Sequence, residues 1–281
     1  MTGRNIALTG VPRGGTTLAC RLLGRCPQTV ALFEPMDVSE LDTRDRGQAI
    51  AQVSAFYADA RSSLEQRGLA PSKQRGGEVP DNPFDHERGA GGRRRLQAHL
   101  GMIEVPRPDP GFTLVVKHNA AFTALLPELS GRFETIAIVR NPLSVLASWQ
   151  TVDVPVADGH LPAGERLDPR LRTRLAAQDD RLGRQLHILH WFFERFRSAL
   201  PPHRVVRYED VVATAGAALT QVAGLQPAPD DTLRDRNANV LYAGEDVGRL
   251  LDALGPAGPW DAWYAWDDLR DVAGRMGQEL L

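Results

Sequence analysis

Five short runs of apolar and β-branched residues recur along the chain, and each is followed by a segment with helical spacing. Strands that are apolar almost throughout and that alternate with helices are typical of a parallel sheet with both faces covered. The pattern therefore predicts an α/β fold in which helices flank a central parallel sheet. The predicted strands are residues 6–11, 30–33, 113–118, 135–140 and 204–209.

Helical spacing of apolar residues marks the segments that follow these strands. The longest is residues 170–200, which we expect to form one helix with a single apolar stripe. The other predicted helices are residues 17–23, 44–66, 120–129 and 142–151.

Two segments have no periodic pattern. Residues 71–95 are rich in Gly, Pro and charge, which predicts a long surface loop, an active-site lid or a disordered insert. The three consecutive arginines at 93–95 are more typical of a solvated face than of a binding patch. Residues 152–169 form a second loop that contains Pro and Gly. We find no internal repeat and expect residues 1–281 to form a single domain.

The composition is that of an ordinary globular protein. The 281 residues are 42% hydrophobic and 24% charged, which argues against a disordered or collagen-like chain. No apolar run approaches the roughly 20 residues of a membrane-spanning helix, and the first residues do not resemble a secretory signal. A net charge of -2 gives no overall attraction to nucleic acid or anionic lipid. We therefore expect a cytoplasmic protein without a nucleic-acid or membrane partner, whose anion sites are local.

A phosphate-binding loop is predicted directly after the first strand. Residues 10–17 read GVPRGGTT and lead into a helix, and Gly10, Gly15 and Thr17 match the pattern GxxxxGK[ST]. Backbone N–H groups in such a loop hold an anion at a helix N-terminus. Thr16 replaces the lysine, and no Walker-B acidic strand end is present, so the grip on a γ-phosphate and its magnesium is missing. The alternative is a glycine-rich turn without a ligand.

A second anion site is predicted after the fourth strand. That strand ends in Arg140, and Asn141 and Pro142 are placed as the N-cap and first residue of the next helix. Ser144 and Ser148 lie four residues apart on one face of this helix. An arginine at a strand end and a nearby serine hydroxyl are suited to bind an anion. Arg140 alone is more typical of a surface ion pair, but a second anion site on a neighbouring strand of the same sheet edge favours anion binding.

The two sites together resemble the sulfotransferases that use 3′-phosphoadenosine 5′-phosphosulfate, in particular the tyrosylprotein and carbohydrate branches. Residues 10–18 (GVPRGGTTL) look like the 5′-phosphosulfate loop of that family, and residues 138–149 (IVRNPLSVLASW) look like its 3′-phosphate motif. Residues 206–211 (VRYEDV) look like a strand whose tyrosine lines the adenine pocket. The resemblance covers most of the chain loosely.

This resemblance implies a P-loop-like fold and 3′-phosphoadenosine 5′-phosphosulfate (PAPS) as the donor co-substrate. Tyr208 would lie beside the adenine, Lys117 resembles the lysine that stabilises the bridging oxygen, and Glu34 resembles the catalytic carboxylate. The implied donor-binding residues are Arg13, Gly14, Gly15, Thr16 and Thr17 at the 5′-phosphosulfate, and Arg140 and Ser148 at the 3′-phosphate.

Two features of the family are missing from this sequence. It lacks the glycine-rich, lysine-bearing C-terminal segment of the cytosolic branch and the membrane anchor of Golgi members. The acceptor hydroxyl therefore remains open between a tyrosyl peptide, a sugar and a small-molecule natural product. We expect residues 152–200 and the insert at 71–95 to build a helical acceptor-binding part.

Sulfuryl transfer passes through a loose, in-line transition state, so positioning and fixed positive charge suffice for catalysis and a metal is not expected. A P-loop nucleotide kinase or hydrolase is the alternative enzyme class, and a non-catalytic nucleotide-binding module is the third interpretation. Binding alone does not require both Arg13 and Lys117, which favours an enzyme.

Two residues are candidates for the general base, Glu34 and His118. Consecutive strand residues point to opposite faces, so His118 should face away if Lys117 faces the donor, unless the strand has ended. Glu34 ends a predicted strand before Pro35, which places its carboxylate at the sheet edge where α/β proteins bind ligands. We therefore expect Glu34 to be the base, and an ion pair between Glu34 and Arg13 is the alternative.

Overall fold

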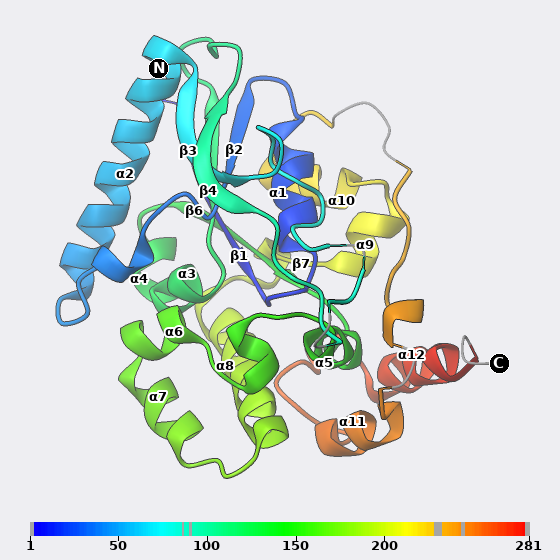
Figure 1. Ribbon diagram of the computed structural model, residues 1–281. Helices are drawn as coiled ribbons and strands as arrows, with labels where there is room; N and C mark the ends of the chain where they lie inside the picture. The colour runs from blue at the N-terminus through cyan, green and yellow to red at the C-terminus, as the bar shows by residue number, and fades with distance from the viewer. Residues whose placement is uncertain (1–2, 86, 90–91, 228–231, 243–244, 279–281) are drawn as a thin grey trace.

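A parallel five-stranded sheet forms the centre of the molecule (Figure 1). The computed structural model describes residues 3–85, 87–89, 92–227, 232–242 and 245–278. All five predicted strands are present, which confirms the α/β class with helices flanking a parallel sheet. In spatial order the strands are β2 (Thr29–Phe33), β5 (Thr113–Lys117), β1 (Asn5–Gly10), β6 (Glu134–Val139) and β7 (Val205–Arg207).

The order of the strands creates a crevice at the end of β1. From β1 the chain passes to one side of the sheet for β2 and β5, and β6 and β7 then lie on the other side. Ala7 is paired with Val116 on one neighbour and with Thr135 on the other, so β1 is the central strand. Ligands of open α/β sheets bind where the connections diverge in this way, at the carboxyl ends of the strands.

Both faces of the sheet are covered, which is why its strands are apolar almost throughout. On β1, Ala7 belongs to one core, whereas Ile6 and Leu8 belong to the other, as the alternation of a strand requires. The second core is closed by α1 (Thr16–Gly24), α9 (Tyr208–Ala213) and α10 (Ala217–Ala223). The larger core is closed by α2 (Arg46–Arg67), α5 (Pro142–Gln150) and several other helices.

Three helix predictions are confirmed and two are corrected. Helices α1, α2 and α5 match the predicted segments, and Asn141 caps α5 by accepting from Leu143 N–H. The segment 120–129 is two short helices, α3 (Ala120–Ala124) and α4 (Leu126–Ser130), because Pro127 cannot continue a helix.

The predicted helix at 170–200 is also divided. It consists of α7 (Pro169–Ala176) and α8 (Arg181–Ala199), and Asp180 caps the second helix by accepting from Gly183 N–H at 2.9 Å. The residues between them include two aspartates, which favour a cap over a helix interior, so the signal for the break was present in the sequence. The loop predicted at 152–169 contains a 3₁₀ turn (Pro155–Asp158) and α6 (Pro162–Leu167).

The segment 71–95 is not simply a surface loop. Its first residues belong to β3 (Leu69–Gln74), which forms an antiparallel pair with β4 (His99–Glu104) that the hydrophobic pattern did not predict. Phe84 is 5% exposed and Arg94 is 4% exposed, so the expected solvated arginine face is wrong for Arg94. Residues 86, 90 and 91 lie outside the described part of this segment.

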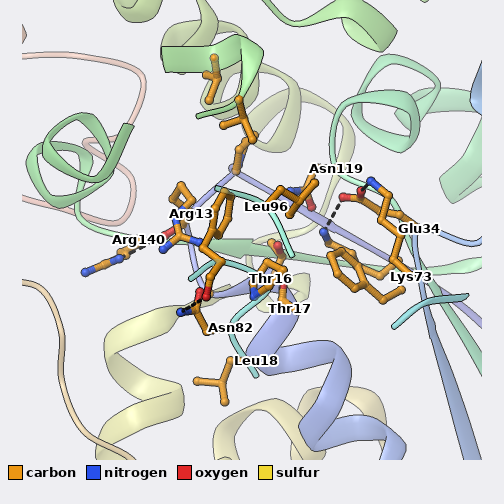
Figure 2. Close-up of a pocket in the computed structure, with 18 of the residues that line it drawn as sticks. Arg13, Thr16, Thr17, Leu18, Glu34, Lys73, Asn82, Leu96, Asn119 and Arg140 are labelled. Carbon is orange, nitrogen blue, oxygen red and sulfur yellow. Dashed lines mark hydrogen bonds and ion pairs between the residues drawn. The ribbon is translucent and has the colours of Figure 1, made fainter. Parts of the chain in front are cut away.

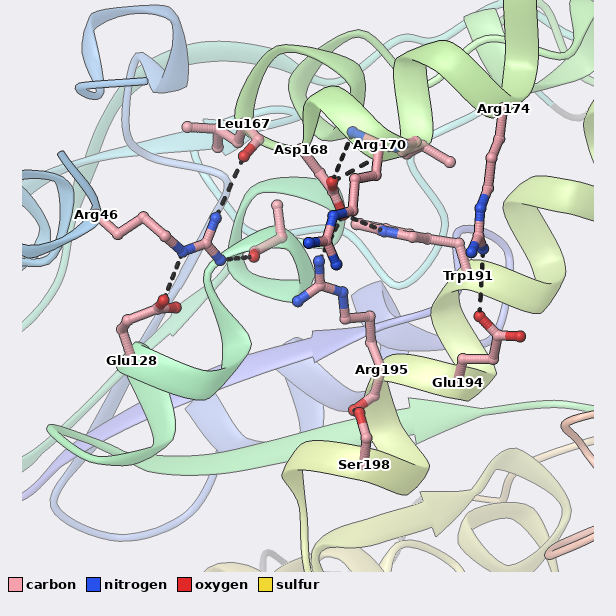
Figure 3. A network of polar contacts seen from close by, with 12 residues as sticks. Arg46, Glu128, Leu167, Asp168, Arg170, Arg174, Trp191, Glu194, Arg195 and Ser198 are labelled. Carbon is pink, nitrogen blue, oxygen red and sulfur yellow. Dashed lines mark hydrogen bonds and ion pairs between the residues drawn. The ribbon is translucent and has the colours of Figure 1, made fainter. Parts of the chain in front are cut away.

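A buried carboxylate fixes the helical part beside the sheet (Figure 3). Asp168 is 5% exposed and caps α7 by accepting from Arg170 N–H at 3.0 Å. It also accepts from Trp191 Nε1 at 2.9 Å and from Arg195 Nη2 at 2.5 Å, both on α8. These bonds satisfy a buried charge and join α6, α7 and α8 into one unit.

The C-terminal region was not predicted in any detail. It contains a 3₁₀ turn (Val240–Tyr242), α11 (Val247–Leu254) and α12 (Trp266–Gln278), and the two helices pack beside α5 (Figure 1). In the part of the chain that the structure describes, no helix combines the length and the apolar character needed to cross a bilayer.

Candidate active site

A cavity of about 660 Å³ opens at the carboxyl edge of the sheet, within the usual range of ligand pockets (Figure 2). Every strand of the sheet sends a polar or aromatic side chain into it from its carboxyl end or from the residues that follow. In the order β1, β2, β5, β6 and β7, these are Arg13, Glu34, Lys117, Arg140 and Tyr208.

The predicted phosphate loop forms a tight turn between β1 and α1. Gly14 N–H donates to Val11 O at 2.8 Å, and Gly15 has a φ of 88°, a left-handed conformation that favours glycine. Within the described residues, the N–H groups of the first helical residues, Thr16 and Thr17, have no hydrogen-bond partner. Free N–H groups at a helix N-terminus are a site for an anion.

Arg13 projects from this loop into a cluster of cations. Its Nε donates to Ser148 Oγ at 3.1 Å, and its guanidinium lies 4.4 Å from the centre of the Phe84 ring. Burial and the neighbouring guanidinium groups of Arg94 and Arg140 lower the pKa of Arg13 to about 9. Among the described residues, no carboxylate forms an ion pair with any of these three arginines, so this end of the cavity lacks its counter-charge.

Ser148 does not line the cavity. It is completely buried, and its contact with Arg13 places it behind the loop, where it orients the guanidinium. Gly14 is also buried, and its N–H closes the turn by donating to Val11 O. Gly15, Thr16 and Thr17 line the cavity.

Arg140 is held firmly by the protein itself. It is 5% exposed, its Nε donates to Asn237 Oδ1 at 2.7 Å, and its Nη1 donates to Arg13 O at 3.1 Å. Its Nη2 donates to Arg236 O and to Tyr242 Oη. The protein itself therefore uses most of the N–H donors of Arg140, and one N–H of Nη1 is left to bind an anion.

Tyr208 lies between the loop after β1 and Arg140. The Arg140 guanidinium is 4.8 Å from the centre of the Tyr208 ring, and a methyl group added at Gly15 would be 2.6 Å from that ring. The expectation that Tyr208 belongs to a strand is wrong, because β7 ends at Arg207 and Tyr208 begins α9. It still faces the cavity because the helix starts at the sheet edge.

Glu34 lies between the only two lysines of the chain. One carboxylate oxygen accepts from Lys117 Nζ at 2.7 Å, and the other accepts from Lys73 Nζ at 2.6 Å. The alternative of an ion pair with Arg13 is therefore wrong. Burial alone would raise the pKa of Glu34, but the two ammonium groups and His118 hold it well below its usual range.

His118 is buried at the end of β5 and lines the cavity. The strand ends at Lys117, so the alternation that would turn His118 away no longer applies. Burial lowers the pKa of His118 to about 3, and its Nε2 accepts from Met36 N–H at 3.2 Å. The ring is therefore neutral at pH 7, and the lone pair of Nε2 is already in use.

The structure brings all the predicted chemical groups to one edge of the sheet and adds residues that the sequence did not reveal. Lys73 comes from β3 and Arg94 from the segment whose composition predicted a loop. The rarity of lysine in this chain was the only signal for Lys73. In the described residues, no three His, Cys, Asp or Glu side chains are grouped as ligands for a metal.

Comparison with known proteins does not place the chain in a family. No protein-family model matches the sequence, and no curated protein matches it with significant similarity. The fold and the geometry of the cavity therefore carry the functional interpretation.

Proposed function

We propose that this protein is a sulfotransferase that moves a sulfuryl group from PAPS to an acceptor hydroxyl by in-line transfer without a metal. One observation carries the proposal. Free N–H groups and three guanidinium groups that form no ion pair with a described carboxylate meet a lysine–carboxylate pair from the neighbouring strands in the same cavity. Such an arrangement suits an anionic donor whose reaction needs fixed charge and one proton acceptor.

The residues present fit the donor. The N–H groups at the start of α1 and Arg13 suit the 5′-phosphosulfate, and Tyr208 suits the adenine. The remaining N–H of Arg140 suits the 3′-phosphate, with the side chain of Arg236 nearby on the same wall. Thr16 at the lysine position offers no ammonium for a γ-phosphate, which disfavours a kinase or hydrolase.

Lys117 and Glu34 have complementary roles in this mechanism. Lys117 donates to the oxygen that bridges phosphorus and sulfur, and stabilises the charge left there when the sulfur–oxygen bond breaks. Glu34 takes the proton of the acceptor hydroxyl as the oxygen–sulfur bond forms. A hydroxyl oxygen that is bonding to sulfur becomes strongly acidic, so a carboxylate with a lowered pKa remains an adequate base.

The geometry favours Glu34 over His118 as the base. The Nε2 of His118 accepts from Met36 N–H, and its other ring nitrogen then carries the proton of the neutral tautomer. Neither nitrogen is free to accept a proton. Glu34→Gln should therefore lower kcat by about 10² or more, the scale of a lost general base, and His118→Ala should leave more activity.

Calorimetry with adenosine 3′,5′-bisphosphate tests the donor site. The bisphosphate should bind at least tenfold more tightly than AMP or ADP, and Arg13→Ala should weaken it by roughly 10-fold to 150-fold, the value of a charged hydrogen bond. Arg132→Ala, an exposed arginine outside the cavity, is the matched control and should bind as the unmodified protein does. Equal affinity for AMP and the bisphosphate would refute the donor assignment, and magnesium-dependent ATP turnover would favour a kinase or hydrolase.

A further inference from the structure

The lining of the cavity is not uniform in chemistry. The guanidinium groups lie where the loop after β1 meets Arg140, whereas the part beyond Glu34 and Lys117 is built from small and branched apolar side chains. We call this the apolar wall. Its members are Val38, Ala121, Val154, Val156, Leu161 and Ala163.

The apolar wall adjoins the reacting groups through the chain itself. Val38 lies four residues after Glu34, and Ala121 lies four residues after Lys117 at the start of α3. The rest of the wall belongs to the 3₁₀ turn at Pro155–Asp158, to α6 and to the residue that precedes each of them. An acceptor seated against this wall therefore lies next to the proposed base.

Polar contacts behind the wall hold it in place. Arg166 on α6 donates to Leu41 O at 2.8 Å and to Val38 O at 2.5 Å, which joins α6 to the segment after β2. Gln185 on α8 donates to Val156 O at 3.1 Å and to Ala157 O at 2.9 Å. The wall is thus preorganised, and it does not need to form around a ligand.

The wall offers no charge complement to a polar acceptor. Among the cavity-lining residues between 154 and 163 of the described chain, His160 is the only titratable side chain; it is exposed and lies 3.5 Å from Glu165. The lysines next to the wall, Lys117 and Lys73, are already paired with Glu34, so an acidic peptide would find no unpaired ammonium group there. The six side chains of the wall carry no polar atom, so a sugar seated against them would bury hydroxyl groups without partners, which costs about 1–3 kcal/mol for each group. One polar group next to the wall is Asn119 Oδ1, which is buried without a hydrogen-bond partner among the described residues and can accept from one acceptor hydroxyl.

The volume of the cavity also favours a small acceptor. About 660 Å³ must accommodate both the nucleotide and the acceptor, whereas ligand pockets of roughly 300–1,000 Å³ commonly hold one drug-sized molecule. The space left beside a nucleotide suits a small molecule.

We infer that the acceptor is a small, uncharged hydroxyl compound with an apolar body, of the alkylphenol or alicyclic alcohol type. This inference rests on the proposed function. The hydroxyl points to Glu34, and the apolar body contacts Val156, Leu161 and Ala163. In the reaction the hydroxyl oxygen bonds to sulfur, its proton goes to Glu34, and the electron pair of the broken bond stays on the phosphate oxygen of the donor.

A series of 4-methylphenol, 4-ethylphenol and 4-propylphenol tests the inference, because their hydroxyl groups have nearly the same reactivity. Each methylene buried on the wall should raise kcat/KM about fourfold. With PAPS as donor, 4-propylphenol should exceed 4-hydroxyphenylacetate, N-acetylglucosamine and an aspartate-flanked tyrosyl peptide by at least tenfold. A flat series, or preference for the sugar or the peptide, would overturn the inference and leave the sulfotransferase proposal standing.

A bulky side chain placed on the apolar wall is a second test, and the same side chain placed outside the cavity is its control. Ala163→Phe should reduce the affinity for 4-propylphenol at least tenfold and leave the affinity for adenosine 3′,5′-bisphosphate unchanged. Ala176→Phe places the same side chain at an exposed position of α7 outside the cavity and should change neither. Calorimetric binding of the phenols gives a readout that does not require turnover.

These measurements separate the two possible failures. If the bisphosphate does not bind, the proposed donor is wrong. If the bisphosphate binds but the phenols do not, or if Ala163→Phe leaves their binding intact, the acceptor inference is wrong while the proposed function survives.

Discussion

Replacing Glu34 should destabilise the protein because it leaves a buried ammonium without its counter-charge. Lys117 is 2% exposed and has Glu34 as its ion-pair partner, at 2.7 Å. Removing one partner of a buried pair costs about 3–5 kcal/mol. Glu34 is 24% exposed and Lys117 keeps its proton, so water reaches the unpaired ammonium in part and we expect Glu34→Gln to cost about 3 kcal/mol, the lower end of that range.

The second lysine should matter less for stability. Lys73 is 30% exposed, and its pair with Glu34 is partly screened by water. Lys73→Met should therefore cost about 1 kcal/mol. Urea unfolding at pH 7 measures both variants, and Glu104→Gln, an exposed carboxylate on β4, is the control that should stay within about 0.5 kcal/mol.

The pH dependence gives an independent check. Because the folded pKa of Glu34 is lowered, its contribution is fully present above the pKa of the unfolded chain, about 4.3, and is lost as pH falls through the lowered value. The stability difference between the unmodified protein and Glu34→Gln should therefore be constant from pH 7 to about 5 and shrink below about 4.3. A variant as stable as Glu104→Gln, or a difference that grows on acidification, would refute the assigned electrostatics.

Three further predictions concern the donor loop, the catalytic lysine and the helical part. Lys117→Met should lower kcat at least a hundredfold with little change in the affinity for adenosine 3′,5′-bisphosphate, and a loss confined to donor affinity in steady-state kinetics and calorimetry would contradict its role. Gly15→Ala should weaken bisphosphate binding at least tenfold in calorimetry, because the added methyl group meets Tyr208 at 2.6 Å and the backbone φ is 88°; unchanged affinity would refute this packing. Asp168→Ala should cost about 3 kcal/mol in urea unfolding, because it removes a helix cap and leaves Arg195 and Trp191 without their acceptor, whereas a cost below 1 kcal/mol would mean that the network is not needed.

The sequence by itself determined the sheet and the groups at its edge. Strands buried on both faces must be apolar along their whole length, so their positions were evident, and parallel strands bring their carboxyl ends to one edge. The strand pattern alone therefore predicts that Arg13, Glu34, Lys117 and Arg140 lie together. Local chemistry also determined the cap at Asn141, because a side-chain acceptor before a proline acts within a few residues.

Tertiary structure alone decided the surroundings of these groups. Lys73 reaches Glu34 from a hairpin that is 39 residues away in sequence, and no local pattern encodes such a contact. Three of the Arg140 hydrogen bonds go to Arg236, Asn237 and Tyr242, about 100 positions further along the chain, so its place at a strand end did not show that only one of its N–H groups is left for an anion. The apolar wall is likewise assembled from three separate segments. Burial and charge pairing depend on which distant segments meet, and these meetings also set the pKa values on which the chemistry depends.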